Sequence, residues 1–86
     1  PMMHNLVLVK PGSRIEIVTA AASLGAAGMA NSFVPESDKV LAATPLVLTG
    51  NTYKLYFKAP TTPGKYEYIC TYPGHGLTMW GTLVVE

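Results

Sequence analysis

The sequence is poor in the residues that build most enzyme sites and structural metal sites. It has one cysteine and two histidines in 86 residues, and only 13% of its residues are charged. One cysteine excludes an internal disulfide, and a closed structural zinc site needs four strong Cys or His ligands. The five acidic residues show no paired arrangement of the kind that acid–base catalysis uses. We therefore expect a protein that is not an enzyme.

The low and balanced charge excludes two further classes. Six basic residues against five acidic ones leave no basic stripe for the phosphates of a nucleic acid. Although 49% of the residues are hydrophobic, no apolar run reaches the roughly 18 residues that a membrane span needs. We expect one small globular domain over residues 1–86, with no nucleic acid partner and no membrane span. A bound metal would reinforce a domain of this size.

Hydrophobic periodicity predicts mostly strands. Period-two or β-rich runs over residues 6–9, 46–48, 52–58, 65–70 and 81–85 predict strands, with a tight turn at 49–51. A capping-box pattern at Ser13 and Glu16 precedes an alanine-rich stretch, which predicts a helix over about residues 14–30. Residues 31–44 are expected to form a loop that packs through its own apolar side chains.

What the sequence does have is a thiolate, an imidazole and a thioether in one short loop. Cys70, His75 and Met79 follow the spacing Cys-x4-His-x3-Met, and Pro73 with Gly74 can reverse the chain between them. Soft thiolate and thioether ligands suit Cu(I), and a plane of one Cys and two His with a weak axial Met is the blue-copper arrangement. His4 is the only other histidine in the sequence, so it is the candidate fourth ligand.

Other chemistries fit these residues less well. Each residue taken alone has an ordinary explanation, because a lone cysteine is usually a small core residue and a histidine near a chain end is usually exposed. A binuclear copper centre would need a second cysteine. A cysteine hydrolase would need an oxyanion motif beside Cys70, and the sequence has none.

The chain resembles the cupredoxins, the small blue-copper proteins, and specifically those of the azurin and auracyanin type. The resemblance rests on residues 3–9 (Met-His-Asn-Leu-Val-Leu-Val), on Phe33-Val34-Pro35, and on residues 64–75 together with Met79. It implies an all-β, Greek-key β-sandwich with one helical flap at about residues 14–30. It also implies one copper, with His4, Cys70 and His75 as equatorial ligands and Met79 as the axial ligand.

The resemblance assigns supporting roles near this site. Asn5 is expected to tie its strand to the ligand loop near Thr71, and the backbone N–H groups of Asn5 and Tyr72 are expected to donate to the Cys70 sulfur. Such outer contacts tune a metal's potential. Tyr72 stands where a proline would remove one of these donors.

In this family the first histidine follows two or more strands, whereas this chain begins just before it. We therefore expect a sandwich without its N-terminal strands, the C-terminal portion of the full fold. Self-association or a complementing segment would then cover the gap.

The function that the resemblance implies is one-electron, outer-sphere transfer between redox partners, with a partner docking weakly near His75. A periplasmic or otherwise extracytoplasmic location is implied with it. The alternatives are a copper storage or delivery module, which Met2, Met3 and His4 would permit, and a metal-free interaction fragment of a larger redox protein.

Overall fold

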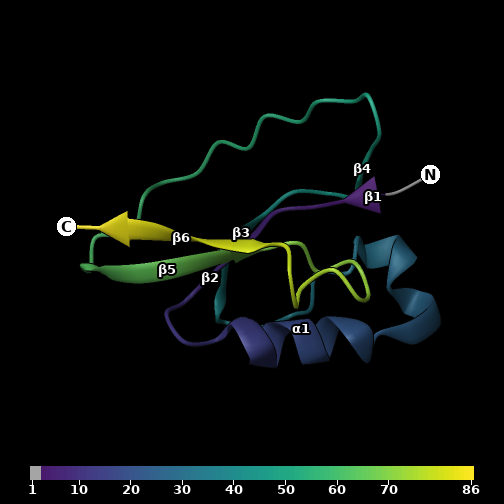
Figure 1. Cartoon of the computed structure of the whole chain (residues 1–86), viewed down its shortest axis with the longest axis horizontal. Helices are drawn as coiled ribbons and strands as arrows, with labels where there is room; N and C mark the ends of the chain where they lie inside the picture. Colours follow the sequence, from purple (N-terminus) through teal and green to yellow (C-terminus); the bar gives the residue numbers. More distant parts are fainter. Residues whose placement is uncertain (1–2) are drawn as a thin grey trace.

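The computed structural model describes residues 3–86 and contains two antiparallel sheets and one α-helix. The larger sheet has the strand order β3-β2-β5-β6, and the smaller one pairs β1 with β4. Their bounds are β1 Met3–His4, β2 Val7–Val9, β3 Val40–Ala43, β4 Val47–Leu48, β5 Gly64–Ile69 and β6 Trp80–Val85. Figure 1 shows α1 (Arg14–Ala22) along one face of the larger sheet.

The core lies between the larger sheet and α1. Val7, Val9 and Ile69 alternate along β2 and β5 so that they share one face of the sheet, and Ile17 meets them from the helix. All four side chains are fully buried. Burial of a Val or Ile side chain stabilises a fold by about 1.5–3 kcal/mol, so this small cluster fixes α1 on the sheet that ends at the ligand loop.

The helix is shorter than the alanine-rich stretch predicts. The α-helix ends at Ala22, and two short 3₁₀ helices follow at Gly25–Ala27 and Met29–Asn31. Gly25 has a left-handed φ of 55°, which interrupts regular helical hydrogen bonding. The prediction of a helix to residue 30 is therefore wrong beyond Ala22, although the segment remains a compact flap.

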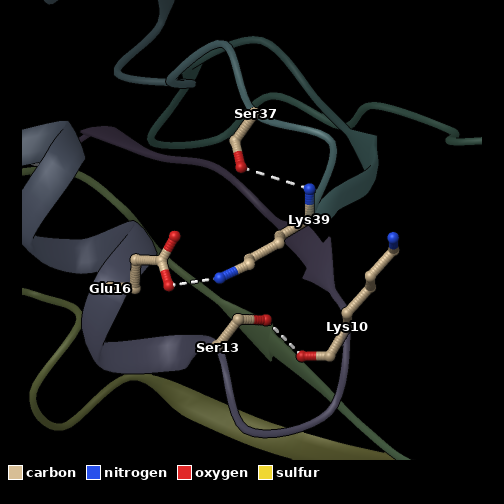
Figure 2. Close-up of polar contacts among 5 residues, drawn as sticks. All are labelled: Lys10, Ser13, Glu16, Ser37 and Lys39. Atoms are coloured by element: carbon tan, nitrogen blue, oxygen red, sulfur yellow. Dashed lines mark hydrogen bonds and ion pairs between the residues drawn. The ribbon is translucent and has the colours of Figure 1, made fainter.

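The predicted capping box at the start of α1 is also wrong. Ser13 makes no side-chain hydrogen bond to the helix N-terminus, and its hydroxyl donates instead to the carbonyl of Lys10. Glu16 points away from Ser13 and pairs with Lys39, as Figure 2 shows. This hydrogen bond, together with the charge of Glu16, raises the pKa of Lys39 above its ordinary value. The helix is thus held to the 37–39 loop by an exposed ion pair.

Two strand predictions need correction. Residues 40–43, expected within a loop, form β3 because they find a partner in β2, with Val7 opposite Ala43. Residues 52–58, expected to be a strand, form none, and they belong to the segment that arches away from the larger sheet in Figure 1. Alternating apolar and polar residues form a strand only when the edge of another strand pairs with them. Tyr56, within this segment, is 85% exposed. The turn at 49–51 is present, with Asn51 N–H donating to Leu48 O at 3.0 Å.

The face of the larger sheet opposite α1 is incompletely covered. Tyr68 on β5 and Leu6 before β2 are both exposed there by more than a third. That self-association or a complementing segment covers this face stays a prediction, which sedimentation velocity of the 86-residue chain would test. Among residues 3–86, no helix has the length and apolar character to cross a bilayer.

Candidate metal centre

The four predicted ligands come from three places in the chain. His4 ends β1 and lies opposite Val47 of β4. Cys70 directly follows β5, and His75 and Met79 lie on the loop that joins β5 to β6. The site is therefore built where the end of β1 meets the β5–β6 connection.

Backbone hydrogen bonds fold the ligand loop back on itself. His75 N–H donates to Tyr72 O at 2.9 Å, and Met79 N–H donates to His75 O at 2.8 Å. Cys70 N–H closes the loop by donating to Met79 O at 3.0 Å. Gly74 supplies the left-handed conformation that the reversal needs, with a φ of 87°. The backbones of Cys70 and Met79 therefore lie side by side at the two ends of the loop.

Three ligand side chains converge on one point. Cys70 Sγ lies 3.7 Å from His4 Nδ1 and 3.5 Å from His75 Nδ1, and all three ligand atoms lie within 4.8 Å of one another. Ligand bonds of roughly 2.0–2.3 Å, arranged in a plane around one metal ion, place such donors roughly 3.5–3.9 Å apart. The spacing thus fits three ligands of a single ion.

Burial and donor chemistry favour copper among the metals. Cys70 is only 4% exposed and the two histidines are half-buried. Met79 is 40% exposed, and its backbone is hydrogen-bonded to both His75 and Cys70, which keeps it beside these two ligands in the loop. One thiolate, two imidazoles and a thioether are the ligand set that copper prefers.

Asn5 links this cluster to the rest of the fold. Its side-chain amide donates to Thr71 Oγ1 and to Ser32 O, each at 2.8 Å, and its carbonyl accepts from Thr71 N–H at 2.8 Å. Thr71 Oγ1 in turn donates to Phe33 O at 2.7 Å. The expected tie between Asn5 and the ligand loop is therefore present, and it joins the residues that follow His4 and Cys70.

Two contributors to this network were not anticipated from the sequence. Ser32 and Phe33 both have left-handed φ values, 53° and 54°, and their carbonyls accept the hydrogen bonds of Asn5 and Thr71. Non-glycine residues rarely take this conformation, so no sequence signal marks it. The end of the flap is thereby built into the support of the site.

Tyr72 flanks the loop histidine. Its ring centroid lies 5.0 Å from that of His75 and makes an edge contact with Phe33 at 5.4 Å. The rings of His4 and His75 are themselves 5.0 Å apart. That the backbone N–H groups of Asn5 and Tyr72 donate to the Cys70 sulfur stays a prediction.

The whole chain matches a known protein family. Residues 1–86 match the copper binding proteins of the plastocyanin/azurin family. Auracyanin-A of Chloroflexus aurantiacus is 40% identical over 83 residues, which are 96% of this chain and 51% of that protein. Azurin iso-2 of Methylomonas sp. is 39% identical over 88 residues, which cover 99% of this chain and 66% of that protein. Auracyanin-B of Chloroflexus aurantiacus is 42% identical, and the match covers 36% of its length.

Solved structures agree with these relatives. The Methylomonas azurin iso-2 superposes with a TM-score of 0.85 at 36% identity, over 99% of this chain and 66% of that one. The blue copper protein auracyanin A superposes with a TM-score of 0.84 at 38% identity, over 99% and 68%. The resemblance to azurin and auracyanin and the cupredoxin-like fold are therefore confirmed. That this chain is the C-terminal portion of a larger fold stays a prediction. With His4, Cys70, His75 and Met79 arranged for a single copper ion, the chain belongs to the copper-binding plastocyanin/azurin family.

Proposed function

We propose that this chain carries single electrons between redox partners by outer-sphere transfer, and that it is not an enzyme. His4, Cys70, His75 and Met79 would together hold one copper ion. The observation that carries the proposal is the convergence of three ligand atoms within 4.8 Å from separate parts of the chain. Bound copper supplies the Cu(I)/Cu(II) couple.

The residues around the site suit rapid electron exchange because they resist movement. The hydrogen bonds of Asn5 and Thr71 hold the ends of β1 and β5 together, and the bond from Met79 N–H to His75 O fixes the loop. Burial of Cys70 keeps water away from the thiolate. A site whose ligands keep one geometry in both oxidation states has little to reorganise when an electron arrives.

The proposal is tested by loading the chain with one equivalent of Cu(II). We expect an intense visible thiolate-to-Cu(II) band and a reversible titration of one electron per copper. Zinc-loaded protein is the control and should show no visible band. Copper bound without the band would contradict the electron-carrier function and would favour storage or delivery of copper.

We further propose that a redox partner docks weakly on the exposed side of the ligand loop. Leu77 is 65% exposed on this loop, and Pro73 and Gly74 beside His75 are exposed as well. A small apolar rim of this kind suits the brief contacts of electron-transfer complexes. The electron would pass to the partner through His75, because His75 is the ligand that lies within this rim.

Leu77→Glu should lower the electron self-exchange rate between the Cu(I) and Cu(II) forms by about tenfold, because two like charges would face each other in the encounter complex. NMR line broadening of mixed oxidation states measures this rate. Val84→Glu is the matched control, since Val84 is 57% exposed on β6 outside the loop. Equal rates for the two variants would place the docking surface elsewhere.

An extracytoplasmic location, in the periplasm where the cell has one, accompanies this proposal. It is supported by the resemblance to azurin and auracyanin. Fractionation of the source cells with an antibody against the chain would test it, and detection in the cytoplasm alone would contradict it.

A further inference from the structure

Arg14, the first residue of α1, contacts the residues that directly follow the ligands His75 and Met79, and it also contacts β5. Its Nη1 donates to the carbonyl of Gly76 at 3.0 Å, and its guanidinium carbon lies 4.3 Å from the centre of the Trp80 ring. Its Nε lies 3.6 Å from a carboxylate oxygen of Glu67 on β5. Gly76 directly follows the ligand His75, and Trp80 directly follows the ligand Met79. The Arg14 side chain thus contacts the chain at Gly76 and at Trp80, on either side of residues 77–79.

The ligand loop also rests directly on α1 at the same place. Gly76 is buried, and a Cβ added to it would lie 2.4 Å from Val18 Cγ2. The loop can approach the helix this closely only because residue 76 has no side chain. The ligand loop therefore packs directly against α1 at Gly76.

The environment of Arg14 gives these contacts their strength. Its side chain is 19% exposed and that of Glu67 is 18% exposed, so water competes only partly for either group. Hydrogen bonds from a charged donor are stronger than neutral ones, and a guanidinium stacks on an indole ring while its edge still donates. The planar guanidinium makes both contacts from one rigid group.

We propose that Arg14 is a positioning residue, which holds the loop between His75 and Met79 in its ligand geometry through Gly76 O and the Trp80 ring and biases the site toward the reduced state through its positive charge. The part that concerns the reduced state rests on the proposed electron-carrier function. The part that concerns loop geometry does not require copper. The two parts are therefore tested separately.

The first test follows amide hydrogen exchange in the metal-free 86-residue chain. Arg14→Gln should speed exchange of the Met79 amide, whose N–H donates to His75 O within the loop, by about tenfold, the effect of losing one hydrogen bond to a charged group that is partly screened. The Val9 amide in the central strand β2 is the internal reference. Lys65→Gln on β5, an exposed position, is the matched control for lost charge.

The second test measures the reduction potential of the copper-loaded variants. Arg14→Gln should lower the ratio of reduced to oxidised protein several-fold at a fixed solution potential, because it removes a positive charge and leaves Glu67 unpaired. Arg14→Lys should recover most of this ratio but not the protection of the Met79 amide, since an ammonium group cannot donate to Gly76 O and stack on Trp80 as a guanidinium does.

Three results would overturn the proposal. One is unchanged Met79 exchange in Arg14→Gln relative to Lys65→Gln. Another is an equal acceleration at Val9, which would mean that Arg14 supports the whole fold and not the loop. The third is full protection of the Met79 amide in Arg14→Lys. A chain that takes up no copper would refute the electron-carrier function, while the exchange data would still decide whether Arg14 positions the loop.

Discussion

Replacing Cys70 with Ser should abolish the intense visible band of the copper-loaded chain entirely. That band requires a thiolate bound to Cu(II), and Cys70 is the only cysteine in the sequence. A serine hydroxyl is a hard ligand that does not match copper's preference for soft sulfur. Copper affinity should fall with the colour, because the two imidazoles would then have only the thioether of Met79 as a soft partner. Absorption spectroscopy with one equivalent of Cu(II) measures the first effect, and competition with a chelator measures the second.

The control for this experiment is Met79→Leu. An axial thioether contributes weakly to binding and tunes the potential, so this variant should keep the colour and raise the reduction potential. Cys70 is buried, and an unpaired hydroxyl there would cost about 1–3 kcal/mol of stability. Circular dichroism of both metal-free variants checks that they fold. Colour that survives in Cys70→Ser, or is lost in Met79→Leu, would overturn the ligand assignment.

The ligand loop is the part that the sequence predicted best, because its information is local. Cys70, His75 and Met79 are fixed by spacing within one turn-rich stretch, and Gly74 supplies the conformation that the turn requires. The role of His4 came from counting histidines and from the resemblance carried by residues 3–9, since no local spacing connects His4 to the loop. The structure supplies that missing contact by placing its Nδ1 3.7 Å from Cys70 Sγ.

The errors have a common cause, which is that tertiary partners decide what a local pattern becomes. Residues 52–58 alternate as a strand does, yet no neighbouring edge pairs with them. Residues 40–43 carry a weaker pattern, yet they pair with β2. Ser13 had the sequence of a helix cap, but the turn after β2 brings the Lys10 carbonyl within its reach. Propensity is a weak prior wherever such a partner is present.

The roles of Arg14 and of the Ser32–Phe33 turn could not be predicted from the sequence either, because they too depend on tertiary contacts. Arg14 acts on Gly76, far along the chain, and Ser32 and Phe33 act through carbonyls that no side-chain pattern reveals. Asn5 differs from them because the resemblance to azurin and auracyanin pointed to it. Its contacts tie the residue after His4 to the residue after Cys70.

Asn5→Ala should therefore destabilise the chain by about 3 kcal/mol. The change removes the hydrogen bonds to Thr71 and Ser32 and leaves Thr71 N–H, which is buried, without its acceptor. An orphaned buried polar group costs about 1–3 kcal/mol, and a domain of this size has only about 4–13 kcal/mol in total. Denaturant unfolding of the metal-free chain measures the loss. Asn51→Ala, at an exposed position, should change the unfolding free energy by less than about 0.5 kcal/mol.

A double-mutant cycle with Thr71→Val separates the link between Asn5 and Thr71 from the other contacts of Asn5. Valine removes the hydroxyl that accepts from Asn5 and donates to Phe33 O, but it leaves the backbone N–H that Asn5 accepts. We expect a coupling energy above about 1 kcal/mol, as for buried residues in one network. Copper affinity should fall most in Asn5→Ala, because the hydrogen bonds that connect the residue after His4 to the ligand loop are then lost. Additive effects, with copper affinity unchanged, would mean that β1 is held against Cys70 by its pairing with β4 alone.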